Sequence, residues 1–288
     1  MKTSTSEFHL IGGLRQHVRL WGAVDAPKLF LLHGWMDMSA TFQFVVDALA
    51  REWRVIAPDW RGFGLSEWQH SPYWFPDYLA DLDALLEIYS PQQAVNLAGH
   101  SMGGNVACLY TGIRPQRIAK LASLEGFGMP ATQPSLAPSR YRFWLDQLRK
   151  EATHKTYAGR AALAARLQHG NPRLSAAQAE FLAQHGGAEQ KDGGVSWAGD
   201  PYHRHVNPLL YRLDEAMACW LNVEAPVLWV TARDSAMAKG FREREDDYCA
   251  RLACFRNLRE VTIEDAGHNM QHDQPQVLAR LLEDFFAG

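Results

Sequence analysis

Ser101 has the clearest potential for covalent chemistry in this chain, because a serine hydroxyl attacks carbonyl carbons once a base takes its proton. It lies in the segment Gly99-His100-Ser101-Met102-Gly103, after a largely apolar run at residues 94–98 and before a helix-like run of small residues. This pattern predicts a strand, a sharp turn and a helix, with the hydroxyl projecting above the edge of a sheet. The two glycines keep bulk away from a tight corner. The alternative is an ordinary glycine-rich turn before a helix.

A serine nucleophile also needs a histidine base and a carboxylate that orients it. The base candidate is His268, which follows the last expected strand in Ala266-Gly267-His268. The acid candidate is Asp234, in the loop after the strand that ends at Val230, and the order Ser101, Asp234, His268 is the one expected for this turn. Glu125, after the strand at residues 118–124, is the alternative acid. We expect it instead to be a loop carboxylate bonded to backbone amides.

An oxyanion intermediate needs backbone N–H donors that point at it. One donor is expected from Met102, directly after the nucleophile, and the other from Trp35, in the loop after the strand at residues 28–32. Gly34 would allow unusual backbone geometry in that loop. His33 is expected to tie loops together beneath the site.

Aromatic residues are frequent in the segments expected around the site, which predicts an apolar pocket for an acyl or aryl group. The pocket candidates are His33, Trp60, Phe63, Phe127 and Trp144. The spacing of His and Cys predicts no metal site, since His203-X-His205 is a weak pair more typical of a solvated loop. No glycine motif is placed as a dinucleotide site requires, so no cofactor is expected.

These residues must be positioned by alternating strands and helices, which predict an α/β fold with a mostly parallel sheet. A hairpin at residues 7–21 starts the sheet, and further strands are expected at residues 28–32, 54–58, 94–98, 118–124, 226–230 and 258–263. The alternation breaks at residues 130–222, where helices are expected and no buried strand. We interpret residues 1–129 and 223–288 as the core. Residues 130–222 are interpreted as a helical cap, or lid, over the carboxyl ends of the strands, where ligands bind in such folds.

Composition excludes several classes of function. The chain has 288 residues, of which 47% are hydrophobic, and a net charge of -3, which argues against a nucleic-acid or anionic-membrane partner. The first residues lack the apolar core of a signal peptide, and no apolar run is long enough to span a bilayer. The four cysteines show no Cys-X-X-Cys spacing and are expected to be reduced, as in a cytoplasmic protein.

Four motifs together resemble the α/β-hydrolase superfamily, and they occur nearly throughout the chain outside residues 130–222. They are His33-Gly34-Trp35, Asp59-X-Arg61-Gly62-X-Gly64-X-Ser66, Gly99-X-Ser101-X-Gly103-Gly104, and Ala266-Gly267-His268. The resemblance implies an eight-stranded sheet flanked by helices, an inserted helical cap and a Ser-Asp-His triad. Asp59 and Arg61 are expected to fix loops.

Within the superfamily the chain is similar to esterases and serine-hydrolase-like proteins, and the stretch from Asp192 to Pro201 resembles the latter. Haloalkane dehalogenases and epoxide hydrolases of this fold use an aspartate nucleophile, so Ser101 counts against both. The expected activity is that of a carboxylesterase acting on a small ester or related acyl substrate through an acyl-enzyme, as a monomer or homodimer. Two alternatives remain: a carbon–carbon hydrolase of diketone-like substrates with the same residues, and a non-catalytic binding protein on this scaffold.

Overall fold

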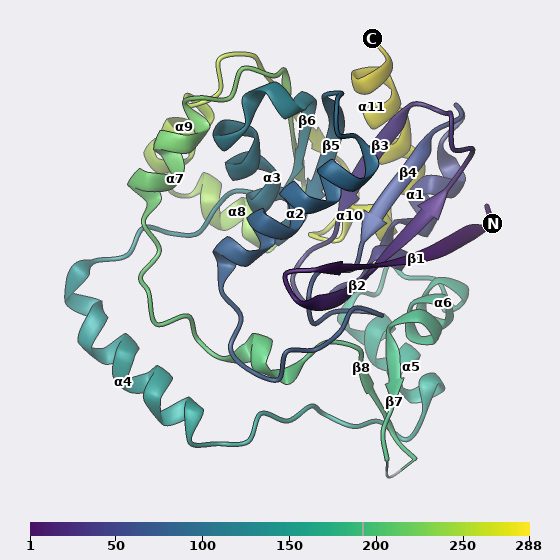
Figure 1. Cartoon of the computed structure of the whole chain (residues 1–288), viewed down its shortest axis with the longest axis vertical. Coiled ribbons are helices and arrows are strands. Elements are labelled where there is room, and N and C mark those ends of the chain that lie inside the picture. Colours follow the sequence, from purple (N-terminus) through teal and green to yellow (C-terminus); the bar gives the residue numbers. More distant parts are fainter. Residues whose placement is uncertain (192) are drawn as a thin grey trace.

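One eight-stranded sheet forms the centre of the molecule in the computed structural model, which describes residues 1–191 and 193–288 (Figure 1). The strand order is β1-β2-β4-β3-β5-β6-β9-β10. β1 pairs antiparallel with β2 and β2 antiparallel with β4, whereas all later neighbours are parallel. The strand bounds are β1 Ser4–Ile11, β2 Leu14–Trp21, β3 Lys28–Leu32, β4 Arg54–Pro58, β5 Val95–His100, β6 Ile118–Leu124, β9 Val227–Ala232 and β10 Leu258–Ile263. The predicted eight-stranded, mostly parallel sheet is therefore confirmed.

Helices cover both faces of the sheet, which explains why the central strands are largely apolar. One face carries α2 (Phe75–Tyr89), α3 (Met102–Ile113), α8 (Ala236–Arg242) and α9 (Glu245–Leu252) around one hydrophobic cluster. The other face carries α1 (Gln43–Ala48), α10 (Met270–Asp273) and α11 (Pro275–Ala287) around a second cluster (Figure 1). The parallel strands end at one edge of the sheet, where the loops that follow them come together.

The insertion between β6 and β9 contains α4 (Ala137–Leu148), α5 (Arg160–Gly170), α6 (Ala176–Gly186), β7 (Gly187–Glu189), β8 (Val195–Trp197) and α7 (Leu213–Trp220). Short 3-10 turns lie at Ser39–Phe42, Pro115–Arg117, Pro134–Leu136 and Pro201–Arg204. α5 and α6 lie beside the antiparallel β7–β8 pair, below the sheet in Figure 1. The expectation of a wholly helical insertion is therefore wrong, because β7 and β8 pair with each other outside the main sheet.

The last helix of the insertion belongs to the core. Ala216 and Trp220, one helical turn apart on α7, are both buried in the same cluster as α3. Trp220 stacks on Phe255 at a ring distance of 5.9 Å. The cap boundary expected at residue 222 is thus too late, since the packing of α7 places it with the α/β core.

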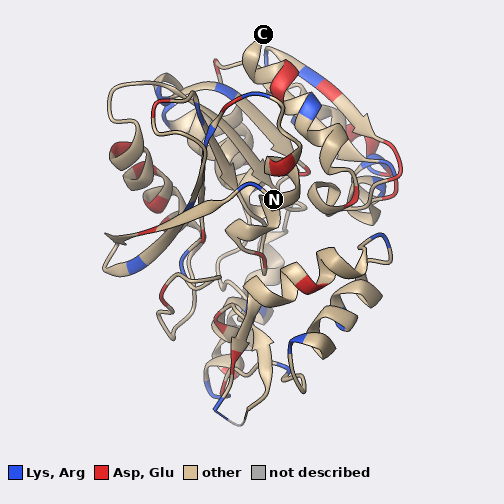
Figure 2. Cartoon of the chain, turned by 90° about the vertical axis from the view of Figure 1, so that its right-hand side faces the viewer, with Lys and Arg blue, Asp and Glu red and all other residues tan. Residues whose placement is uncertain are grey.

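α4 differs from the other helices of the insertion, because it buries none of its residues. Its Tyr141, Phe143, Leu145 and Leu148 are all exposed, and Figure 1 shows the helix standing apart from the sheet. Acidic and basic residues are interspersed over the face shown in Figure 2. Among the described residues, no helix combines the length and apolar character needed to cross a membrane.

Candidate active site

Ser101 occupies a strained turn between β5 and α3. Its φ of 52° and ψ of -115° lie in a region that L-residues rarely adopt. The turn is held because the Ser101 N–H donates to the Leu124 carbonyl at 2.8 Å and the Ser101 carbonyl accepts from Asn105 N–H at 2.9 Å. A Cβ at Gly99 would overlap the Gly103 carbonyl, and one at Gly103 would overlap the Leu32 carbonyl. Both glycines are therefore required sterically, and the predicted strand, turn and helix are present.

His268 is held by Glu125. The His268 Nδ1 lies 2.6 Å from the Glu125 Oε2, in the loop that follows β10. A carboxylate only accepts hydrogen bonds, so this contact requires the proton on Nδ1 and leaves Nε2 free to accept another. Glu125 is 1% exposed and also accepts from the Ala232 N–H at 2.9 Å and the Ser235 hydroxyl at 2.7 Å. The expectation that Glu125 bonds to backbone amides is thus partly correct, but it did not include the contact with His268.

The prediction that Asp234 orients His268 is wrong, because its carboxylate pairs with other side chains. The Asp234 side chain is 38% exposed and pairs with Arg173 at 2.7 Å and with Lys239 at 4.0 Å. β9 continues to Ala232, and the Asp234 N–H donates to the Ala266 carbonyl at 2.9 Å. Asp234 therefore lies at the surface, with its carboxylate directed to cations rather than to the imidazole.

Glu125 reaches the histidine because the backbone turns at once where β6 ends. Its φ is 55°, in the left-handed region, and its N–H donates to the Val230 carbonyl at 2.9 Å on the neighbouring β9. This placement, together with a side chain one methylene longer than that of aspartate, carries the carboxylate beneath His268. The order of residues along the chain contains no signal for this reach.

Two backbone amides flank Ser101 in positions suited to oxyanion stabilisation. Met102 is the first residue of α3, and Trp35 follows Gly34 in the loop after β3. Neither N–H donates to another group among the described residues. A Cβ added at Gly34 would lie 3.3 Å from the Ser101 Cβ, so the loop passes directly beside the serine. The helix N-terminus adds positive potential at the same place.

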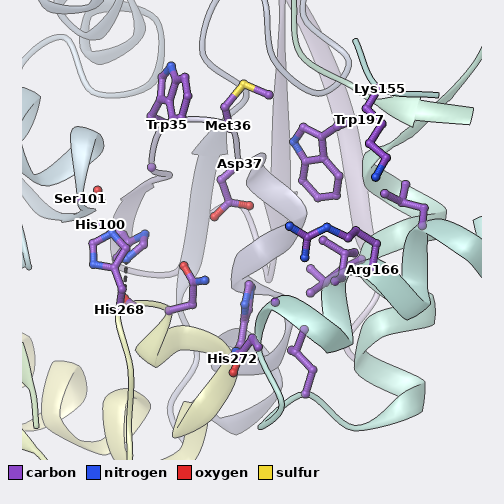
Figure 3. Close-up of a pocket in the computed structure, with 18 of the residues that line it drawn as sticks. Trp35, Met36, Asp37, His100, Ser101, Lys155, Arg166, Trp197, His268 and His272 are labelled. Atoms are coloured by element: carbon purple, nitrogen blue, oxygen red, sulfur yellow. Dashed lines mark hydrogen bonds between the residues drawn. The ribbon is translucent and has the colours of Figure 1, made fainter. Parts of the chain in front are cut away.

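A pocket of about 520 Å³ opens beside these groups (Figure 3). Ser101, His100 and His268 lie on one side of it, and α5, α6 and β8 supply the other side. The loop after β3 contributes Trp35, Met36 and Asp37, and the apolar part of the cap wall is Leu163, Leu167, Leu174, Leu182 and Trp197. The volume is within the range typical of small-molecule sites.

Known proteins resemble this chain over most of its length. The family model for the alpha/beta hydrolase fold matches residues 27–275. This chain belongs to the α/β-hydrolase family. It is 28% identical over 300 residues to a serine hydrolase-like protein of Danio rerio, in a match that covers 99% of this chain and 89% of the relative.

Two solved structures are similar to this α/β-hydrolase over nearly the whole chain. The thioesterase domain from the curacin biosynthetic pathway superposes with a TM-score of 0.86 at 25% identity, covering 98% of this chain and 99% of that domain. An esterase from Mycobacterium tuberculosis superposes with a TM-score of 0.73 at 19% identity, covering 100% of this chain and 92% of the esterase. The second likeness concerns the fold alone.

The five residues predicted to line the pocket of this hydrolase are not among those that line it. Trp60 and Phe63 are fully buried in the core, and Phe127 stacks on Phe241 at 4.8 Å. Trp144 is on α4, outside the pocket. Trp60, Phe63 and Phe127 therefore pack in the core, and Trp144 lies on a helix outside the pocket, so the predicted pocket role of these residues is wrong.

His33 is a structural residue, as the sequence reasoning also indicated. Its Nε2 accepts from the Trp60 N–H at 2.9 Å, its Nδ1 lies 2.7 Å from the Gly34 carbonyl, and burial lowers its pKa to about 4. Trp35, which was predicted as an oxyanion donor, also lines the pocket with its side chain, whereas Trp197 was not among the predicted site residues. A signal for Trp197 was available in the stretch from Asp192 to Pro201, although Asp192 itself lies outside the described residues.

His100 does not compete with His268 as a base. It is 2% exposed, and burial is the main reason that its pKa lies well below the ordinary value. Its Nε2 bonds the His268 carbonyl at 2.8 Å, and the two rings lie 4.7 Å apart. His100 therefore fixes the loop that carries His268.

Asp59 and Arg61 hold the loop after β4 in place. Asp59 binds the His17 Nδ1 at 2.7 Å and the Leu65 N–H at 2.9 Å. Burial alone would raise the pKa of Asp59, but these hydrogen bonds and the charge of His17 hold it below its usual range. Arg61 makes two contacts of 2.6 Å with Asp81. The expected loop-fixing contacts of both residues are present.

His203 also has a structural environment. It is stacked between Phe63 at 3.7 Å and Tyr73 at 3.6 Å, and burial lowers its pKa to about 3. Among the described residues, no group of three or more His, Cys, Asp or Glu side chains could hold a metal ion.

Proposed function

We propose that this protein is a serine hydrolase that cleaves carboxylic esters through an acyl-enzyme. The observation that carries the proposal is the shared pocket of Ser101 and His268, together with the 2.6 Å contact between His268 and Glu125. A strained serine beside a histidine oriented by a buried carboxylate is the arrangement that nucleophilic acyl transfer requires.

In the proposed reaction, the Ser101 hydroxyl attacks the ester carbonyl while His268 Nε2 takes its proton. The amides of Trp35 and Met102 bind the developing oxyanion. The carbon–oxygen bond to the alcohol then breaks, and the alcohol leaves with the proton from His268. Water, deprotonated by His268, attacks the acyl-enzyme and releases the acid and the free serine. Glu125 stabilises the imidazolium in both halves without taking its proton.

Thioesters are a second candidate substrate class. The supporting observation is the full-length likeness, at a TM-score of 0.86, to a thioesterase domain. The same serine and histidine would attack a thioester, and the thiol would leave in place of an alcohol. Carbon–carbon cleavage of diketone-like substrates needs the same groups, but no contact of the described residues favours it.

A fluorophosphonate probe tests the proposal, because it reacts with an activated serine and not with ordinary surface serines. We expect rapid labelling of the wild-type protein and none of Ser101→Ala, which should remain folded by circular dichroism. Ester turnover should fall by roughly 10⁴- to 10⁶-fold in Ser101→Ala. If folded wild-type protein is not labelled and cleaves no ester or thioester, it is a binding protein on this scaffold.

A further inference from the structure

Three cationic side chains line the same pocket as Ser101. Lys155 lies before α5, Arg166 lies on α5, and Arg204 lies at the end of a 3-10 turn after β8. Within the part of the chain that the structure describes, none of the three makes an ion pair or a hydrogen bond to a carboxylate. Lys155 only approaches the Tyr157 ring, at 5.3 Å.

This absence of partners contrasts with two other arginines of the same insertion. Arg160 pairs with Glu189 at 2.8 Å, and Arg173 pairs with Asp234 at 2.7 Å. The chain as a whole carries a net charge of -3, so unpaired cations do not follow from a general excess of basic residues. The positive charge is concentrated where the substrate would lie.

Asp37 is the carboxyl group that lines the same pocket. It accepts from the Met38 N–H at 2.9 Å, and no ion pair joins it to Arg166 in the described structure. Burial raises the pKa of Asp37 to about 7, so near neutral pH it carries only part of a negative charge. Burial lowers the pKa of the lining residues His154 and His272, which are therefore neutral. The pocket thus has a net positive charge.

Lys155 and Arg166 lie on the cap side of the pocket (Figure 3). Figure 3 shows the Arg166 guanidinium projecting from the cap side toward the centre of the pocket, where Asp37 lies. Ser101 and His268 lie across the pocket from it. An ester bound with its carbonyl carbon at Ser101 would therefore extend its other end toward Arg166 and Lys155. A guanidinium binds carboxylate or phosphate oxygens through paired N–H donors.

We propose that the cationic wall formed by Lys155, Arg166 and Arg204 binds a negatively charged group of the substrate. The enzyme should then prefer anionic esters or thioesters over neutral ones of equal length. The inference rests on the proposed hydrolase function and specifies its substrate class. The anion can belong to the acyl chain, as in a half-ester of a dicarboxylic acid. It can also belong to the leaving group, as in the phosphates of a coenzyme A thioester.

The first test compares monomethyl adipate with methyl hexanoate, which have equal chain length and differ in the terminal carboxylate. Acid release is followed by pH-stat titration. We expect kcat/KM for the adipate ester to exceed that for the hexanoate by about tenfold or more, a ratio that one charged contact can produce. Added salt should lower this ratio, because it screens the attraction.

The variants Arg166→Gln, Lys155→Gln and Arg204→Gln locate the binding group. At least one should bring the adipate-to-hexanoate ratio close to one, and Arg166→Lys should retain part of the preference. Arg142→Gln is the matched control, because Arg142 is an exposed cation of α4 outside the pocket, and it should leave the ratio unchanged.

A second pair of substrates identifies the source of the anion. Hexanoyl-coenzyme A is compared with the hexanoyl thioester of N-acetylcysteamine, which has no phosphate. A preference for the coenzyme A thioester alone, lost in the same variants, assigns the anion to the leaving group. Equal kcat/KM values within both pairs, or preferences that no variant reduces, would overturn the inference while leaving a working hydrolase. Absence of turnover with all four substrates would instead contradict the proposed function.

Discussion

The choice of acid for His268 is decided by one side chain. Glu125 is buried and contacts His268 Nδ1 at 2.6 Å, whereas Asp234 is occupied by Arg173 at the surface. An amide retains the shape of a carboxylate but cannot stabilise an imidazolium. Glu125→Gln should therefore lower kcat by on the order of 10⁴.

Asp234→Asn is the control for this prediction, because it removes a carboxylate from the same edge of the sheet. It breaks only surface ion pairs, which contribute about 0–1 kcal/mol to stability, and should leave kcat within about threefold. Steady-state kinetics on one ester decide between the two residues. A crippled Asp234→Asn beside an active Glu125→Gln would mean that the histidine changes partner when substrate binds.

The raised pKa of Asp37 makes the free energy of unfolding depend on pH, and one variant can measure this dependence. Its pKa is about 7 in the folded protein, raised by burial, against a usual value near 3.8. Between these two values the unfolded chain has lost the proton that the folded chain retains, so the contribution of Asp37 to stability falls as pH rises.

Asp37→Asn removes this penalty. It should be nearly neutral at pH 4 and should raise the free energy of unfolding by on the order of 1 kcal/mol at pH 8, less than the full shift because the side chain keeps some contact with solvent. Urea unfolding of both proteins at the two pH values measures the difference. An equal effect at pH 4 and pH 8 would contradict the buried-carboxyl explanation.

Among the elements, α7 was expected to belong to the cap but packs in the core, and this packing can be measured. Trp220 is 1% exposed, stacked on Phe255 within the core cluster that includes α3. Removing a buried tryptophan leaves a cavity and costs about 3–5 kcal/mol. Trp220→Ala should therefore lower the free energy of unfolding by that amount.

Phe143→Ala on α4 provides the comparison, because Phe143 is 56% exposed on a helix that buries no residue. It should change the free energy of unfolding by less than about 0.5 kcal/mol. Chemical denaturation of the two variants tests whether α7 belongs to the core. A small effect of Trp220→Ala would return the helix to the cap.

Across the whole molecule, buried neutral histidines should dominate the response to acid. Burial lowers the pKa of His33 and His272 to about 4 and of His203 to about 3, and it places that of His100 well below the ordinary value. The unfolded chain takes up protons at these four positions near pH 6.5, whereas the folded chain does not. Their contribution to stability is therefore lost as pH falls from about 6.5 to about 4.

Asp37 works in the opposite direction over the same range, and burial also raises the pKa of Asp81, but these are two carboxyls against four histidines. We expect the free energy of unfolding to fall by more than about 2 kcal/mol between pH 7 and pH 4.5. Urea titrations at several pH values measure this, and Asp37→Asn should make the loss larger, because it removes an opposing group. A free energy that is constant or rises on acidification would show that these histidines are not held neutral.

The sequence by itself determined the fold and the position of the candidate nucleophile, Ser101. The largely apolar runs at residues 28–32 and 118–124 indicate mostly buried strands, and their alternation with amphipathic helices indicates a parallel sheet. The glycines around Ser101 specify the sharp turn, because any side chain there would overlap backbone. These features depend on neighbours in the chain and on local sterics, so a single sequence contains them.

Only the tertiary structure decided which carboxylate meets His268, which residues line the pocket and where the core ends within the insertion. Glu125 and His268 are 143 positions apart, and their contact depends on a left-handed turn at the end of β6 and the parallel pairing of β6 with β9. Trp60 and Trp197 are both aromatic, yet one packs in the core and the other faces the pocket. Residue type and spacing do not encode such differences, because they arise where separate elements pack against one another.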